Sequence, residues 1–179
     1  MNKMKATGVV RRIDDLGRIV IPKEIRRNLR IREGDSLEIF TDGHSSITFR
    51  KYSPVESIND FIFQYVEALN ASSKKDIIIT DTEKIVAVAG TLKKDLIGKK
   101  ISLRLDDLMQ KRTLQVFEKG EGLEIADKFE YKNSLVMKPI TVYGDVTGCV
   151  IILGDNRIDE VDKALVETSA TFLGKYLES

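Results

Sequence analysis

Four cations in one short segment are spaced to share a single face of a helix. The segment from Leu16 to Arg32 reads LGRIVIPKEIRRNLRIR, and Pro22 suits the first position of a helix, where its missing N–H costs nothing. The cations that follow recur at i, i+3, i+4 and i+7, which brings them to one side of the helix: Lys23, Arg26, Arg27 and Arg30. Like charges at this spacing repel one another by roughly a few tenths of a kcal/mol per pair. The pattern therefore predicts that this face binds a polyanion, with nucleic acid as the candidate and a solvated helix surface as the alternative.

The elements that must position this face are predicted to be one helix and four short strands. The helix covers residues 22–29, and three apolar residues lie on its opposite side: Ile21, Ile25 and Leu29. Before it, β-rich runs at residues 6–13 and 17–21 flank a DDLG turn. After it, residues 37–41 and 47–52 flank an Asp-Gly pair, which is typical of a β-hairpin.

Charge is distributed unevenly along the chain. The whole sequence is nearly balanced, with 29 Lys and Arg against 28 Asp and Glu, but residues 1–53 hold twelve of the cations and only seven of the acids. A basic segment joined to an acidic one is expected where one half of a protein binds nucleic acid. Further cations of the basic segment precede or follow two adjacent acids, Asp14 and Asp15, so internal salt bridges are the alternative to DNA contact for these cations: Arg11, Arg12 and Arg18.

Residues 1–53 are too few to bury a large core of their own, because a segment of about fifty residues leaves much of its apolar surface in water. The segment has no cysteine for a disulfide, and its single histidine, His44, lacks partners for a metal site. Cys149, in an apolar run further on, is predicted to be a small buried residue in a reducing compartment. Because residues 1–53 have neither a large core nor a disulfide or metal site, we expect a dimer in which strands of two copies interleave around a shared core. Such a dimer would set two basic surfaces about a two-fold axis, which suits duplex DNA.

A second domain is predicted to follow the boundary at Ser53 and Pro54 and to cover residues 54–179. Its pattern indicates an α+β fold with an antiparallel sheet. Strands are expected at residues 76–80, 85–89, 134–142 and 147–153, and helices at 92–97, 103–118 and 157–177. The last helix shows large apolar residues on one side: Ile158, Val161, Leu165, Phe172 and Tyr176.

A helix directly after the boundary carries apolar residues with a 3-4-3-4 spacing, as in a two-heptad coiled-coil seam. These residues are Val55, Ile58, Ile62, Tyr65 and Leu69. The spacing fits packing onto the helix's own domain and contact between two copies equally well.

Enzyme classes find little support in the sequence. One histidine and one cysteine do not provide the usual nucleophile and base pairs, and no P-loop, GxGxxG or metal-ligand spacing occurs. We therefore predict a protein that is not an enzyme and has no metal and no cofactor. The apolar runs are too short to span a membrane, and the start MNKMKATG has no apolar core of a signal peptide, so we expect a cytoplasmic protein.

Residues 4–52, which contain MKATGVVRRIDDLGRIVIPKEIRRNLRIREGDSLEIF, closely resemble the AbrB-type swapped-hairpin DNA-binding domain. The resemblance implies an intertwined dimeric β-barrel that presents arginines to double-stranded DNA. By position, it implies that the arginines facing DNA are Arg11, Arg18, Arg26 and Arg27, with Lys5 and Arg12 as backbone contacts. The same domain occurs in antitoxins, so a protein-interaction module that also regulates its own synthesis is the alternative function.

The second domain is similar to GAF domains, which are small-molecule sensing modules. The resemblance lies in Pro139 and Ile140, then Gly144 and Gly148, and an apolar strand at residues 150–153. It implies a ligand of unknown identity. The order of the two domains resembles sporulation regulators of the AbrB family in spore-forming Firmicutes, which implies a nucleoid-associated transcription regulator. It also implies a homotetramer, assembled partly through the helices that flank the GAF-like domain.

Overall fold

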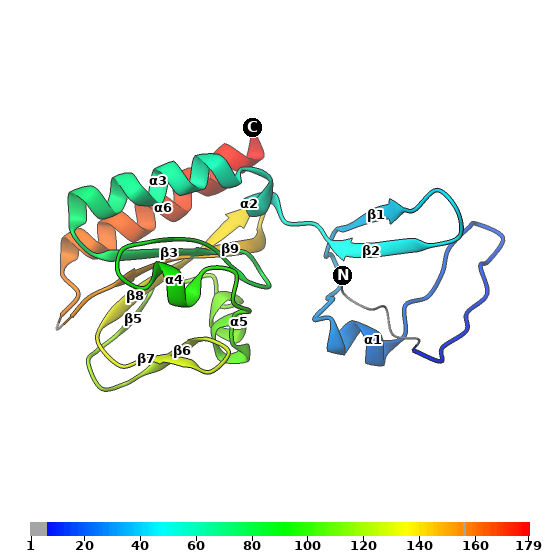
Figure 1. Ribbon diagram of the computed structural model, residues 1–179, viewed down its shortest axis with the longest axis horizontal. Helices are drawn as coiled ribbons and strands as arrows, with labels where there is room; N and C mark the ends of the chain where they lie inside the picture. The colour runs from blue at the N-terminus through cyan, green and yellow to red at the C-terminus, as the bar shows by residue number, and fades with distance from the viewer. Residues whose placement is uncertain (1–6, 156) are drawn as a thin grey trace. The chain divides into compact units, whose positions relative to one another are not determined.

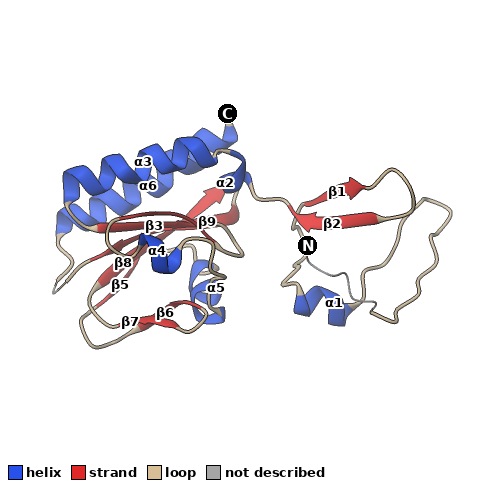
Figure 2. Ribbon diagram, in the orientation of Figure 1, coloured by secondary structure: helices blue, strands red, loops and turns tan. Residues whose placement is uncertain are grey.

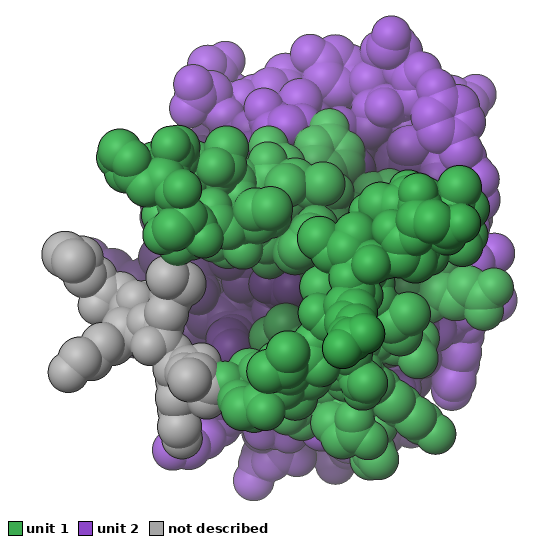
Figure 3. Space-filling view, turned by 90° about the vertical axis from the view of Figure 1, so that its right-hand side faces the viewer, with its two compact units in different colours: residues 1–52 green, residues 53–179 purple. Residues whose placement is uncertain are grey.

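The chain folds as two units, residues 1–52 and 53–179, which Figure 3 colours separately. The computed structural model describes residues 7–155 and 157–179. Lys5, a predicted DNA contact, lies outside the described residues.

The first unit contains one helix and one hairpin (Figure 1). Helix α1 covers Lys23–Asn28, within the predicted segment, with Pro22 just before its first residue. Strands β1 (Leu37–Thr41) and β2 (Ile47–Lys51) pair antiparallel, which confirms the predicted hairpin. One carboxylate shapes the connecting loop, because it accepts hydrogen bonds from the next backbone N–H groups: Asp42 from His44, Ser45 and Ser46. These bonds lower the pKa of Asp42 well below its usual range.

The predicted strands at residues 6–13 and 17–21 are wrong for the single chain. Residues 7–13 and 18–22 have no regular secondary structure. The turn between them does form, since the Asp14 N–H donates to the Arg18 carbonyl and the Gly17 N–H donates to the Asp14 carbonyl, each at 3.0 Å. A strand needs a neighbour to bond with, and no described segment of the chain lies alongside these residues as a pairing partner.

Apolar side chains of the first unit remain in water. None of the Val, Ile, Leu, Phe and Tyr residues among residues 7–52 is buried. The exposed fraction reaches 89% for Val10, 70% for Ile13 and 73% for Val20. Phe40 and Phe49 of the hairpin are also exposed. The described part of this unit therefore has no core of its own in the single chain.

The second unit is built on a five-stranded antiparallel sheet in the order β4-β3-β9-β8-β5 (Figure 2). The strands are β3 (Asp76–Thr80), β4 (Ile85–Ala89), β5 (Gln115–Phe117), β8 (Leu135–Val142) and β9 (Asp145–Leu153). Strands β8 and β9 are joined by Tyr143 and Gly144, both with positive φ, as a tight hairpin of primed turn type requires. The α+β class with an antiparallel sheet is confirmed.

Helices cover both faces of this sheet (Figures 1 and 2). One face carries α3 (Asn59–Ser73) and α6 (Glu160–Glu178), with the short α2 (Pro54–Ser57) before them. The other face carries α4 (Lys93–Leu96), α5 (Leu103–Met109) and the hairpin of β6 (Leu123–Ala126) and β7 (Phe129–Tyr131). A separate cluster of buried apolar side chains packs between the sheet and the elements on each face.

Two predicted elements of the second unit need correction. The helix expected at residues 103–118 ends at Met109, because residues 115–117 instead pair with β8 as edge strand β5. Strands β6 and β7 were not predicted. On α6, the predicted apolar side is also wrong in part, since Val161, Phe172 and Tyr176 are exposed. The buried side is made by other residues of the helix: Val166, Ala170 and Leu173.

The apolar seam of the helix after the boundary packs within its own unit. Val55, Ile62 and Leu69 are buried against the sheet, and Ile58 and Tyr65 are half-buried beside them. On the same face, α6 packs closely against β8 because residue 174 of the helix is glycine. A Cβ added at this position would lie 2.5 Å from the Thr141 carbonyl oxygen.

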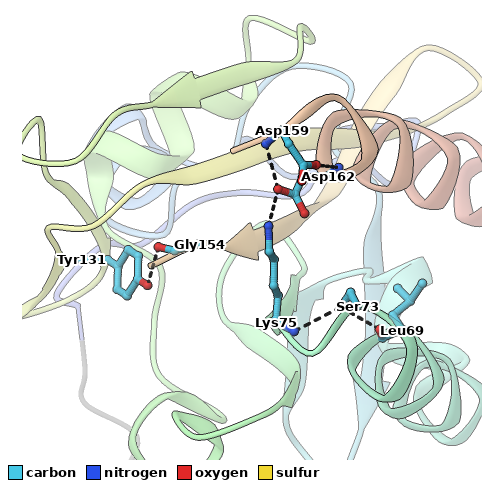
Figure 4. A network of polar contacts seen from close by, with 7 residues as sticks. All are labelled: Leu69, Ser73, Lys75, Tyr131, Gly154, Asp159 and Asp162. Carbon is cyan, nitrogen blue, oxygen red and sulfur yellow. Dashed lines mark hydrogen bonds and ion pairs between the residues drawn. The ribbon is translucent and has the colours of Figure 1, made fainter. Parts of the chain in front are cut away.

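A polar network ties the start of α6 to the turn that follows α3 (Figure 4). Asp159 and Asp162 form a reciprocal capping box at the N-terminus of α6. The buried Asp162 carboxylate also pairs with the Lys75 ammonium. On the α3 side, the Ser73 hydroxyl donates to the Leu69 carbonyl and accepts from the Lys75 N–H. The network therefore fixes α6 next to α3.

We predict that Asp162→Asn lowers the free energy of unfolding of the second unit by about 2 kcal/mol, because it leaves the Lys75 charge without its buried partner. Urea unfolding of the full chain measures this change. Lys163 and Glu160 form an exposed ion pair on the same helix, so Glu160→Gln serves as the control with a change below about 0.5 kcal/mol. Equal stability of D162N and wild type would contradict the importance of the network.

Candidate nucleic-acid interface

The short helix α1 presents three of its predicted cations to solvent. Lys23, Arg26 and Arg27 are exposed, and no ion pair joins them to a described residue. Pro22 is buried and Ile25 is half-buried, so the opposite side of the helix faces the body of the unit. The predicted apolar side is only partly correct, since Ile21 and Ile25 are half-buried but Leu29 follows the end of α1 and is 55% exposed.

Arg30 does not continue this helical face. The helix ends at Asn28, and the Arg30 backbone turns to the left-handed region with φ +52°. Two hydrogen bonds close the end as a Schellman motif: Ile31 N–H to the Arg26 carbonyl at 2.8 Å, and Arg30 N–H to the Arg27 carbonyl at 3.2 Å. Arg30 is half-buried, and its carbonyl accepts from the Lys51 ammonium at 3.2 Å. Its i+7 position on the predicted face is therefore wrong, because the chain leaves the helix before it.

The turn that precedes the helix carries three more predicted contacts. Arg11 and Arg12 lie on the extended segment before the turn, are exposed, and form no ion pair with a described residue. Arg18 follows the turn, and its Nε donates to the Asp14 carboxylate at 2.8 Å while 69% of its side chain remains exposed. Hydrogen bonds from the Arg18 backbone N–H and then from its side chain hold the pKa of Asp14 below its ordinary value. The adjacent Asp15 is exposed and has no such bond.

Lys51 has a different role from the cations above. Its side chain is 8% exposed, and its ammonium pairs with Asp35 at 3.0 Å. Asp35 also accepts from the Arg32 N–H at 2.7 Å. Lys51 therefore fastens the hairpin to the loop after α1, which the sequence did not indicate.

Aromatic residues of the two predicted apolar helix sides meet in a cluster on the second unit, which the sequence did not indicate. Phe61 and Tyr65 of α3 lie beside Phe172 and Tyr176 of α6. The Phe61 and Tyr176 rings stack with centroids 4.7 Å apart, and the Tyr65 and Phe172 rings with centroids 5.7 Å apart. The side chains of Phe172 and Tyr176 are 43% and 42% exposed. Phe61 and Tyr65 are half-buried, so the ring cluster is partly exposed on two adjacent helices.

Three further features of residues 7–155 and 157–179 bear on function. No group of His, Cys, Asp and Glu in these ranges could hold a metal ion. Cys149 is fully buried, and burial raises the pKa of its thiol. No described helix has the length and apolar character that a membrane crossing demands.

Two family descriptions match the chain in separate segments. "Stage V sporulation protein T C-terminal, transcription factor" matches residues 57–178. "Antidote-toxin recognition MazE, bacterial antitoxin" matches residues 10–57. The two matched segments correspond closely to the second and first units of the structure.

Two relatives from Bacillus subtilis (strain 168) match a part of the chain and nearly all of it, respectively. The transition state regulatory protein AbrB is 55% identical over 51 residues, which is 28% of this chain and 52% of AbrB. Stage V sporulation protein T is 44% identical over 177 residues, 98% of this chain and 99% of that protein. The sequence and fold therefore define a transcription factor of the AbrB family. More narrowly, the chain belongs to the stage V sporulation protein T family.

The fold of the second unit agrees with the expected GAF class. The crystal structure of the GAF domain from Acinetobacter phosphoenolpyruvate-protein phosphotransferase superposes with a TM-score of 0.55 at 15% identity, covering 67% of this chain and 81% of that one. At this identity the similarity concerns the fold alone.

Proposed function

We propose that the chain regulates transcription by binding duplex DNA through the cations of its first unit. The observation that carries this proposal is a set of exposed cations for which the described residues provide no ion pair: Arg11, Arg12, Lys23, Arg26 and Arg27. A carboxylate partner would compete with phosphate for each cation, and the described residues provide none for these side chains. Arg18 belongs to the same surface through its exposed terminal nitrogens, and Lys5 and Arg30 remain predicted contacts.

The first unit is proposed to work as an interleaved dimer. Its residues 7–13 and 18–22 lack strand partners among the described residues, and most of the apolar side chains on them are exposed. A second copy that paired with these residues would satisfy their backbone groups and bury those side chains at the same time. The resemblance of residues 4–52 to the AbrB-type domain supports this arrangement, and AbrB is 55% identical to this chain over 51 residues.

The second unit is proposed to join two such dimers into a tetramer through the aromatic face of α3 and α6. Aromatic residues are enriched at the centres of protein interfaces, and these four rings lie on neighbouring helices. The GAF fold further suggests that the unit binds a small molecule, whose identity is open.

The biological role is proposed from the relatives. Similarity to stage V sporulation protein T over nearly the full length supports control of sporulation genes in a spore-forming Firmicute, by a cytoplasmic, nucleoid-associated protein. The MazE match favours a second candidate, an antitoxin-like interaction module. The folded second unit, with its own transcription-factor match at residues 57–178, supports the first candidate better.

We predict that Arg26→Ala combined with Arg27→Ala weakens duplex binding at least tenfold and lowers the salt dependence, since each lost phosphate contact removes roughly 0.9 from the slope of log K against log salt. Fluorescence anisotropy with a labelled duplex measures both. The control removes two exposed cations of the second unit, Lys94→Ala with Lys111→Ala. Unchanged affinity and slope in the first variant would exclude α1 from the interface.

We predict that isolated residues 1–53 form a folded dimer, because a single copy has no buried apolar core. Sedimentation equilibrium gives the mass, and circular dichroism reports the strands. In the full chain, Val10→Asp should dissociate this dimer by placing a charge in the shared core. A folded monomer of the fragment, or a V10D chain with unchanged mass, would contradict the interleaved arrangement.

We predict that Phe172→Ser combined with Tyr176→Ser halves the mass of a full-length tetramer and leaves the second unit folded, since both rings are already exposed in the single chain. Light scattering and thermal unfolding measure the two properties. Val161→Ser on the same helix is the matched control, because Val161 is exposed but outside the ring cluster. A tetramer that survives the double substitution would place the contact elsewhere.

A further inference from the structure

The Asp14 carboxylate holds both the turn and the guanidinium of Arg18. Its Oδ1 accepts from the Leu16 N–H at 3.1 Å and from the Arg18 N–H at 2.7 Å. Its Oδ2 accepts from the Arg18 Nε at 2.8 Å. The backbone bonds between Asp14 and Arg18 close the same loop, with Gly17 at φ +75°. One side chain therefore fixes the path of the loop and the direction of the arginine that leaves it.

The contact uses only one edge of the Arg18 guanidinium. A guanidinium has five N–H donors, of which Nε–H is one, so the four donors on the two terminal nitrogens stay available. No described residue bonds these terminal nitrogens, and the side chain is largely exposed. A planar fork already held along one edge loses less conformational freedom when it binds a second partner. Arg18 is thus prepared for a bidentate contact with two acceptors in one plane.

The charge of the pair distinguishes between the two kinds of acceptor in DNA. The Arg18–Asp14 pair has no net charge, and a DNA phosphate near this pair would repel the Asp14 carboxylate. Such a pair is poorly suited to neutralise the DNA backbone, unlike Arg26 and Arg27, for which the described part of the chain offers no acidic partner. The O6 and N7 atoms of guanine, side by side in the major groove, match the fork without carrying a net charge.

We propose that Asp14 is a positioning residue that directs Arg18 to a guanine edge in the major groove. Arg18 then supplies sequence preference, and Arg26 and Arg27 supply contact with the backbone. This assignment rests on the proposed binding of duplex DNA. The competing role for Asp14 is a plain internal salt bridge that stabilises the turn and lowers the local positive charge.

The test uses full-length protein and duplexes selected by the wild type from a randomised pool. Each guanine of a selected duplex is replaced in turn by 7-deazaguanine, which lacks the N7 acceptor. The variant Asp14→Asn keeps one oxygen for the backbone N–H groups but loses the second acceptor for Nε. Asp15→Asn is the matched control, because it changes the charge equally at an exposed neighbour without that bond. Arg18→Lys keeps the charge and removes the fork.

We expect the wild type and D15N to lose about tenfold in affinity when one particular guanine of each half-site is replaced. D14N and R18K should lose less than twofold at that guanine, and R18K should keep the wild-type salt dependence. Circular dichroism and sedimentation confirm that each variant retains its fold and its mass. If D14N changes the fold or the mass, the test uses R18K in its place. The loss of affinity that R18K shows at the same guanine then decides the role of the Arg18 fork.

Several outcomes would overturn the proposal. D14N with the wild-type response at every guanine would show that Asp14 does not direct Arg18. A uniform gain in affinity for all duplexes, equal in D14N and D15N, would show that Asp14 acts only through its charge. A wild type that binds duplexes without sequence preference removes this assignment and leaves the proposed function standing. A wild type that binds no duplex at low salt removes both.

Discussion

The first unit depends on a constraint that a single chain does not satisfy: its apolar residues need a surface to pack against. None of the Val, Ile, Leu, Phe and Tyr side chains among residues 7–52 is buried, and residues 7–13 and 18–22 have no strand partners among the described residues. Burial of apolar surface is the main stabilising contribution to folding, at roughly 25 cal/mol per Å². A unit that lacks it must gain it from association. The proposed dimer would thus contribute to folding as well as to the proposed DNA recognition.

The local geometry that presents cations is, by contrast, complete within one chain. The Asp14 turn, the Schellman motif at the end of α1 and the Lys51–Asp35 pair are all formed by neighbouring or nearby segments. Each of them uses hydrogen bonds or an ion pair in place of apolar packing. The cations are therefore arranged by polar contacts, and the core that would hold two copies together is made of different residues.

Much of this organisation could be predicted from the sequence, because local patterns determine it. The hairpin around Asp42 and the helix after Pro22 follow from turn residues and spacing. The prediction of strands at residues 6–13 and 17–21 failed because a strand forms only beside a pairing partner, which sequence periodicity does not specify. The predicted helix at 103–118 is wrong beyond Met109, because residues 115–117 pair with β8 despite their helical pattern. The partner of Arg18 was open between Asp14, Asp15 and DNA, and only the three-dimensional turn selects Asp14.

The second unit has a physical consequence for the first. In the proposed tetramer, the first units of two chains joined through α3 and α6 would share a small volume, and their pairing would become partly intramolecular. Effective concentrations for tethered partners reach the millimolar range with short flexible connections. An interface of four aromatic rings could therefore maintain an otherwise weak dimer at low protein concentration. A ligand that altered the α3–α6 face would then change DNA affinity without touching any cation of the first unit, because it would change how often two first units meet.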